Sequence, residues 1–174
     1  MEFGGDIEGL IRDIADFPEP GIVFKDITPV LANPAAFAAV VDHFVDRYTR
    51  RPVDAIVGID ARGFLLAAPV AYRLGLPLIP VRKEGKLPFT KHSVAYELEY
   101  GRNVIEMHTD ALAAGHRVAI LDDLLATGGT LAAAAELVEM GGGEVAELGV
   151  VIELGSLGGR SVLGGRPVHT LISV

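Results

Sequence analysis

The chain has 174 residues, half of them hydrophobic, and a formal net charge of −8 at pH 7. This length suits one domain, and the acidic balance argues against a nucleic-acid surface, which would need a stripe of basic residues. The lack of cysteine excludes disulfides and thiolate chemistry. The first residues lack a signal-peptide pattern and no apolar run reaches about 18 residues, so we expect a cytoplasmic protein without a membrane span.

Hydrophobic periodicity and the positions of glycine and proline predict the elements of the chain. In chain order they are helices over residues 7–14 and 33–50, a strand over 53–59, a helix over 63–74, a strand over 76–81, an exposed loop over 82–92, paired flap strands over 94–99 and 103–107, a strand over 118–121, a helix after 129, and strands over 144–152 and 168–172. This order predicts an α/β fold with a mainly parallel central sheet flanked by helices, in a single domain over residues 1–174.

The segment over residues 117–135 carries the most specific chemical pattern. Its apolar residues 118–121 suit a buried parallel strand, and Asp122 and Asp123 stand where that strand is expected to end. The small residues 126–130 and an alanine-rich helix start follow, so backbone N–H groups there can bind a phosphate. The two carboxylates would repel phosphate but suit the hydroxyls of an attached sugar, or a metal. The segment favours a phosphorylated sugar, and a simple helix-capping turn is the alternative.

Two further strand ends carry charged residues, and ligands of open parallel sheets bind at such ends. Asp60 and Arg62 follow the strand over 53–59, where Arg62 could hold an anion or pair with Asp60 at the surface. Arg82, Lys83 and Lys86 follow the next strand on an otherwise acidic chain. These three cations indicate either a site for several phosphate charges or a solvated loop.

The flap and the N-terminal region give weaker patterns. Strand alternation places Glu97 and Glu99 on one face of the flap and Tyr100 on the other, which by itself indicates an exposed strand edge. Val23 and Phe24 by themselves indicate a core strand. The five histidines share no metal-like spacing.

Five ordered blocks of the chain resemble the type I phosphoribosyltransferases, and the adenine phosphoribosyltransferase branch of that family in particular. The segment Asp122–Thr130 is similar to the family's phosphoribosyl-diphosphate motif. The other blocks are a base-site segment over 17–29, a diphosphate loop over 58–64, a flexible loop and hood over 82–88 and 96–101, and a C-terminal block over 153–160. The resemblance spans about residues 11–160. It implies a small N-terminal hood segment over 1–33 that serves the base site, and a flexible loop and flap over 82–107.

The resemblance implies an enzyme that transfers the 5-phosphoribosyl group from 5-phosphoribosyl 1-diphosphate to adenine, giving AMP and diphosphate. The residues it implies are Asp122, Asp123, Ala126, Thr127, Gly128, Gly129 and Thr130 for ribose 5-phosphate, Arg62, Arg82, Lys83 and Lys86 for diphosphate, Val23, Phe24 and Leu124 for the base, Glu99 as the catalytic proton-handling carboxylate, and Tyr100 as the residue that closes over the site. Lys25 departs from the arginine that some members carry, which weakens any comparison at that position.

The resemblance also implies Mg²⁺ carried with the diphosphate, without a direct protein ligand, and a homodimer in which Arg82 reaches into the partner's site. It further implies an unusual cis peptide in the diphosphate loop. Two alternatives remain open: a sibling transferase that acts on 6-oxopurines, and a non-catalytic regulator that senses 5-phosphoribosyl 1-diphosphate. The regulator would need an output module, for which an acidic single-domain chain leaves no room.

Overall fold

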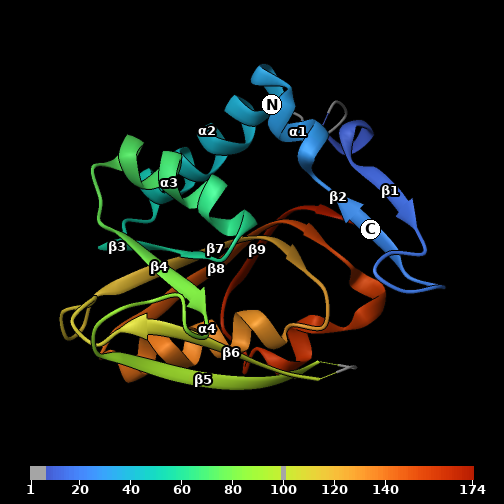
Figure 1. Ribbon diagram of the computed structural model, residues 1–174. Helices are drawn as coiled ribbons and strands as arrows, with labels where there is room; N and C mark the ends of the chain where they lie inside the picture. The colour runs from blue at the N-terminus through green and yellow to red at the C-terminus, as the bar shows by residue number, and fades with distance from the viewer. Residues whose placement is uncertain (1–6, 99–100) are drawn as a thin grey trace. The chain divides into compact units, whose positions relative to one another are not determined.

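The computed structural model describes residues 7–98 and 101–174, and the chain falls into two compact units, Met1–His43 and Phe44–Val174. Figure 1 shows the elements in chain order. Their bounds are η1 Glu8–Leu10, β1 Arg12–Ala15, β2 Val23–Asp26, α1 Thr28–Ala32, α2 Pro34–Arg50, β3 Ala55–Ile59, α3 Arg62–Leu74, β4 Leu78–Lys83, β5 Lys91–Leu98, β6 Gly101–His108, β7 Arg117–Leu125, α4 Gly129–Met140, β8 Glu144–Glu153, η2 Gly155–Leu157, η3 Gly159–Val162 and β9 Val168–Ser173. Among the described residues, no helix is long and apolar enough to cross a membrane.

The first unit contains a two-stranded antiparallel sheet. The helix predicted over residues 7–14 is wrong: a short 3-10 turn is followed by β1, which pairs with β2 so that Ile14 lies opposite Phe24. A helix of eight residues is marginal by itself in water, and a strand partner ten residues further along the chain offers a full set of backbone hydrogen bonds instead. The predicted core strand at Val23 is also corrected, because Val23 is half exposed.

Side-chain hydrogen bonds stabilise the first residues of α1 and α2. Asp26 accepts hydrogen bonds from the backbone N–H and the hydroxyl of Thr28, at 2.9 and 2.7 Å, and so starts the short α1, which the sequence patterns did not predict. Asn33 accepts hydrogen bonds from the N–H groups of Ala35 and Ala36, both at 3.1 Å. This cap starts α2 where Pro34 predicts it.

The second unit contains a seven-stranded sheet, within the described residues, in the order β5-β6-β4-β3-β7-β8-β9. The strands from β4 to β9 in this order run parallel, and β5 and β6 join them as an antiparallel hairpin on β4. The expected α/β fold with a mainly parallel sheet is confirmed. Both flap strands are longer than predicted, since β5 begins at Lys91 and β6 ends at His108.

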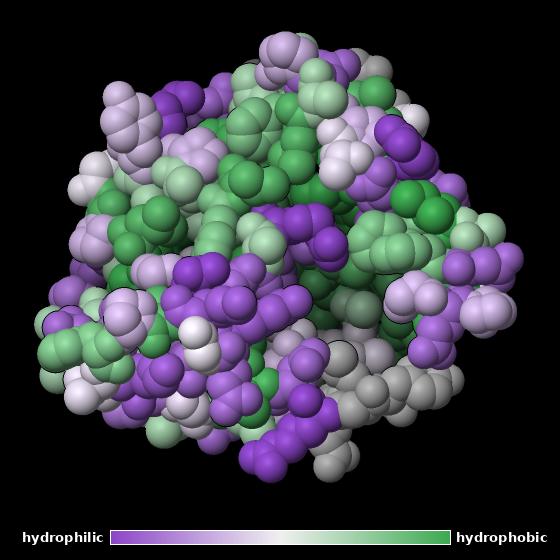
Figure 2. Space-filling model, viewed as in Figure 1, coloured by the Kyte–Doolittle hydropathy of each residue, from purple (hydrophilic) through white to green (hydrophobic). Residues whose placement is uncertain are grey.

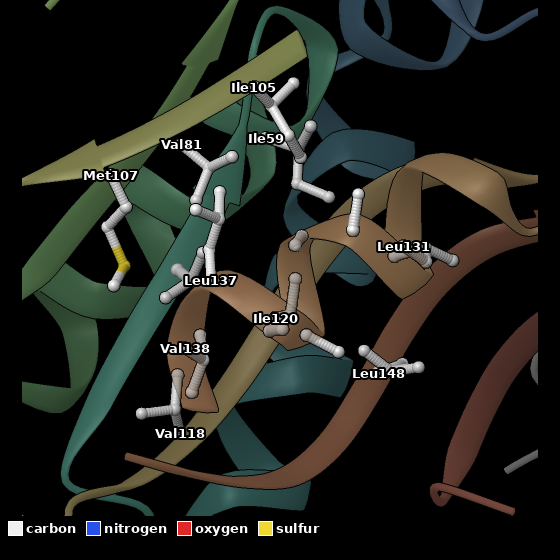
Figure 3. Close-up of a cluster of buried hydrophobic side chains, with 14 of the residues drawn as sticks. Ile59, Val81, Ile105, Met107, Val118, Ile120, Leu131, Leu137, Val138 and Leu148 are labelled. Carbon is white, nitrogen blue, oxygen red and sulfur yellow. The ribbon is translucent and has the colours of Figure 1, made fainter. Parts of the chain in front are cut away.

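Helices cover both faces of this sheet, α3 on one and α4 on the other (Figure 1). Gly58 makes room for α3, because a Cβ there would lie 2.8 Å from the Cβ of Ala67. On the opposite face, the small and aliphatic side chains of α4 pack against alternate residues of the strands, including Ile120 and Leu148 (Figure 3). Strand alternation thus gives each helix its own set of buried side chains.

Candidate active site

The two adjacent carboxylates lie within a strand rather than after its end. The strand predicted to end at Leu121 continues as β7 to Leu125, because β8 is long enough to pair with it up to Glu153. Asp122 and Asp123 are therefore held by the strand ladder, and both line a single pocket. Pairing with β8 fixes the positions of these two side chains more firmly than a loop would.

The small residues after β7 wrap around a pocket of about 190 Å³. Gly128 has a φ of +86° and is the residue before α4 begins, so the chain makes a turn that glycine tolerates best. The residues lining the pocket are Arg62, Asp122, Asp123, Leu124, Ala126, Thr127, Gly128, Gly129, Thr130 and Leu131. All seven residues expected around ribose 5-phosphate thus surround one pocket at a helix N-terminus, where an anion is stabilised.

Arg62 joins this pocket from the first turn of α3. Its Nε donates a hydrogen bond to Asp123, so the pairing with Asp60 that the sequence left open is not the one formed. Gly63 allows the close approach, because a Cβ there would lie 2.6 Å from the backbone oxygen of Leu121. The peptide bond between Asp60 and Ala61 is cis, as the family resemblance implies. A cation therefore lies beside the carboxylates, next to residues 126–130, which we call the phosphate loop for the anion they are expected to bind.

The two carboxylates differ in their environment. Asp123 is 2% exposed and bound to Arg62. Desolvation by burial, and then the charge of Asp123, hold the pKa of Asp122 well above its usual range. The side chain of Asp122 accepts a hydrogen bond from the N–H of Asp123 at 2.9 Å. A raised pKa suits a carboxyl group that waits for hydrogen-bond donors or positive charge on a ligand.

The expected diphosphate cations outside the pocket lie at the end of β4 and in the turn after it. Arg82 Nε lies 3.3 Å from Asp60 Oδ2, and its Nη1 donates to the backbone oxygen of Lys86 at 3.1 Å. Lys83 and Lys86 are exposed. Figure 2 shows hydrophilic side chains gathered over β4, β5 and β6. The turn therefore carries exposed positive charge next to a strand end of the sheet.

Buried Glu106 of β6, which the sequence patterns missed, anchors this basic turn. Its carboxylate accepts hydrogen bonds from the N–H of Gly85 at 3.1 Å and the hydroxyl of Ser93 at 3.4 Å, and it pairs with Lys91 Nζ at 3.1 Å. Lys91 also donates to the backbone oxygen of Leu87 at 3.1 Å. The sequence feature that could have pointed to Glu106 is its position between the apolar residues Ile105 and Met107 in a predicted strand.

Of the residues predicted for the base, Leu124 lines the pocket of about 190 Å³, whereas Val23 and Phe24 belong to the first unit. Phe24 packs edge-on against Phe17, with ring centroids 5.3 Å apart. It belongs to the first unit with Val23, whereas Leu124 belongs to the second, so their joint contact with a base stays a prediction. Glu99 and Tyr100 lie outside the described residues.

The sequence patterns also did not predict what lies behind the phosphate loop. The 3-10 turn η3 packs against this loop. A cavity of about 660 Å³ adjoins the loop at Thr127 and Gly129, between β5, α4 and η3. The block over 153–160 was recognised in the sequence, but its place was not, because no local pattern connects a turn to a loop about 30 residues earlier.

Comparisons with known proteins agree with this geometry. A family model described as the phosphoribosyl transferase domain matches residues 26–161. An adenine phosphoribosyltransferase of Chloroflexus aurantiacus is 56% identical over 167 residues, which cover 96% of each chain, and one of a Roseiflexus species is 57% identical over 163 residues, covering 94% of this chain and 95% of the relative.

Solved structures give the same answer. The adenine phosphoribosyltransferase of Thermoanaerobacter pseudethanolicus superposes with a TM-score of 0.93 at 49% identity, covering 97% of this chain and 98% of the other. The Saccharomyces cerevisiae enzyme, complexed with D-2,5-dideoxy-2,5-imino-altritol 1,6-bisphosphate and adenine, does so with a TM-score of 0.89 at 40% identity, covering 95% and 96%. The matching family model and these relatives show that the chain belongs to the phosphoribosyltransferase family, among the adenine phosphoribosyltransferases.

Proposed function

We propose that this protein transfers the 5-phosphoribosyl group from 5-phosphoribosyl 1-diphosphate to adenine, giving AMP and diphosphate in purine salvage. The observation that carries the proposal is the pocket at the start of α4, where a phosphate loop and two strand-held carboxylates line one small cavity. A phosphorylated sugar satisfies both halves of that pocket at once. The near full-length similarity to adenine phosphoribosyltransferases supports adenine as the acceptor.

Different residues of the pocket bind the phosphate and the hydroxyls of the sugar. The backbone N–H groups of Thr127–Thr130, at the positive end of α4, bind the 5′-phosphate. Asp122 and Asp123 bind the ribose hydroxyls. As the diphosphate leaves, positive charge develops on the sugar ring, and these two carboxylates stabilise it by electrostatics that are already in place. The protein thus acts mainly by positioning and charge.

Arg62, Arg82, Lys83 and Lys86 bind the diphosphate. Arg62 and Arg82 now pair with Asp123 and Asp60, so binding of the diphosphate would exchange one anionic partner for another. Mg²⁺ fits this site, because it is usually held by one or two carboxylates and substrate phosphates, and Asp122 and Asp123 are suited to bind the hydroxyls or waters around it. When bound, the ion offsets the charge of the leaving diphosphate.

The base is held between Phe24 and Leu124, with the backbone of Val23 reading its amino edge, and Glu99 handles its proton. Tyr100 and the flap close over the site and exclude water, which would hydrolyse the sugar donor. Glu99→Gln should lower turnover about 100- to 10,000-fold, the usual range for proton transfer, and leave AMP affinity largely intact. Glu97→Gln is the matched control two residues earlier, and a larger loss in that control would contradict the assignment.

A homodimer in the cytoplasm completes the proposal. The outer face of α3 leaves Leu65 49% and Tyr72 84% exposed, and Leu78 of β4 is 43% exposed. This apolar surface, near the same helix and strand that carry Arg62 and Arg82, suits a second copy of the chain. Light scattering should give twice the chain mass, and Tyr72→Glu should reduce it to one. The cytoplasm follows from the phosphorylated substrate and product, which do not cross membranes unaided.

One assay tests the acceptor. Purified protein is incubated with Mg²⁺, 5-phosphoribosyl 1-diphosphate and one of adenine, hypoxanthine, guanine or xanthine, and the nucleotide formed is measured. The proposal expects AMP from adenine and little product from the other three bases. Product from a 6-oxopurine alone would identify a sibling transferase, and binding of the sugar donor without any product would identify a regulator.

A further inference from the structure

Two glycines meet backbone to backbone behind the phosphate loop. A Cβ on Gly128 would clash with the backbone oxygen of Gly159 and lie 2.7 Å from Cγ2 of Val162. A Cβ on Gly159 would clash with the backbone oxygen of Ala126 and lie 3.1 Å from the backbone nitrogen of Gly128. Gly159 is buried. The turn η3 therefore forms the rear wall of the loop, and a shift of Gly159 toward Gly128 must move the loop.

Arg160, the next residue, fixes η3 to the ends of two strands. Its Nε and Nη2 donate to the two carboxylate oxygens of Glu153 at the end of β8, both at 2.7 Å. Nη2 also donates to the hydroxyl of Thr170 in β9 at 3.2 Å, and that hydroxyl donates to Glu153 at 2.9 Å. These hydrogen bonds lower the pKa of Glu153 and raise that of Arg160, so both are charged at neutral pH.

We propose that Arg160 is a positioning residue for the 5′-phosphate: its two-pronged contact with Glu153 holds Gly159 against Gly128 and so sets the direction of the loop's N–H groups. Arg160 itself lines neither the 190 Å³ pocket nor the adjoining cavity, so it acts through the backbone of η3. The inference rests on the proposed function, because it assumes that this loop binds the 5′-phosphate of the substrate.

The same strand provides a matched control. Glu147, nearer the start of β8, is held by Arg47 through the same pair of hydrogen bonds, from Nε and Nη2. It lies at the opposite end of β8 from Glu153, away from the phosphate loop. Arg47→Gln and Arg160→Gln therefore each remove a two-pronged contact with a carboxylate of the same strand, and Glu147 keeps Arg51 at 3.8 Å. Both should lower the melting temperature, but only Arg160→Gln should alter phosphate binding.

The experiment measures the affinity of each variant for AMP and for adenine by calorimetry, and KM for 5-phosphoribosyl 1-diphosphate. Arg160→Gln should bind AMP about ten-fold more weakly, the scale of one charge-assisted hydrogen-bond set, with adenine affinity nearly unchanged and the donor KM raised. Arg160→Lys should fall between, because lysine keeps the charge but not the fork. Thr170→Val, which removes only the bridging hydroxyl, repeats the test with a smaller loss should Arg160→Gln fail to fold.

Unchanged AMP affinity in Arg160→Gln, or an equal loss in Arg47→Gln, would overturn the inference. Thr127→Asp separates this failure from that of the proposed function, since it places a negative charge at an exposed position of the loop itself. If Thr127→Asp loses AMP while Arg160→Gln keeps it, only the role of Arg160 is wrong. If Thr127→Asp also keeps AMP, the loop is not the phosphate site and both proposals are wrong.

Discussion

At the scale of single residues, the two neighbouring aspartates of β7, Asp122 and Asp123, have different partners and different electrostatic environments. Both line the same pocket, but Arg62 binds Asp123, while Asp122 lies near Gly63, where a Cβ would be 3.1 Å from Asp122 Oδ1. Asp123 is therefore in direct contact with a cation, whereas at Asp122 burial and the charge of Asp123 outweigh the influence of Arg62 on the pKa. Substitution by asparagine keeps the shape of the side chain and removes its charge. We expect it to lower activity at Asp123 and to raise stability at Asp122.

Asp123→Asn should keep the fold and lose most of the activity. Its partner Arg62 has a side chain that is 40% exposed, so water can hydrate the guanidinium when the carboxylate is gone. The loss of one electrostatic contact to the transition state typically costs about 2.7–4 kcal/mol, or roughly 100- to 1000-fold in turnover. Turnover and melting temperature of the purified variant check this, and near-normal turnover would remove Asp123 from the site.

Asp122→Asn should make the protein more stable at neutral pH. Because the pKa of Asp122 is raised in the folded state, the unfolded chain loses this proton first as the pH rises above about 3.9, and the charge then favours unfolding. The variant has no charge there, so its free energy of unfolding should exceed that of the wild type at pH about 7 and approach it below about 3.9. Urea unfolding across this range checks the sign; a variant that is less stable at neutral pH would contradict it.

At the scale of elements, the basic turn between β4 and β5 depends on a strand behind it. Buried Glu106 binds Gly85 of the turn together with Lys91 and Ser93 of β5. Contacts within the turn alone, such as Arg82 to the backbone of Lys86, would leave it free to move as a whole. The hairpin of β5 and β6 therefore holds in position the cations that we propose for the diphosphate.

Glu106→Gln should raise KM for 5-phosphoribosyl 1-diphosphate several-fold and change KM for adenine little. Glutamine can still accept from Gly85, but it loses the ion pair with Lys91, and charge-assisted hydrogen bonds are about twice as strong as neutral ones. Steady-state kinetics with each substrate varied in turn check this. Glu144→Gln, at an exposed position at the start of β8, is the control and should match the wild type; equal changes in both Michaelis constants would argue for general loosening instead.

At the scale of the whole molecule, the proposed dimer makes each active site depend on two chains. Arg82→Ala should weaken binding of the diphosphate donor more than that of adenine, because the guanidinium is a partner for phosphate oxygens. If Arg82 acts across the interface, mixing Arg82→Ala with Asp123→Asn subunits should restore activity at sites that combine the two intact halves. Each variant mixed with itself is the control, and verified mixed dimers without activity would argue for sites built from one chain.

From residue 33 onward, the sequence by itself determined the order of strands and helices, the mainly parallel sheet and the position of the glycine-containing turn before α4. These follow from local causes: apolar runs in buried strands, Pro34 after a capping asparagine, and Gly128 where the chain needs a positive φ. The residues around the loop, from Asp122 to Thr130, are contiguous, so a sequence pattern was enough to collect them.

The tertiary structure alone decided which distant groups meet. Residues 12–15 form a strand because Val23–Asp26 lies beside them, β7 runs on through both aspartates because β8 extends that far, and Arg62 pairs with Asp123 rather than Asp60. Gly159 lies against Gly128 for the same kind of reason. Each outcome is a competition between partners far apart in the chain, and local propensity carries no information about a partner that only folding brings into reach.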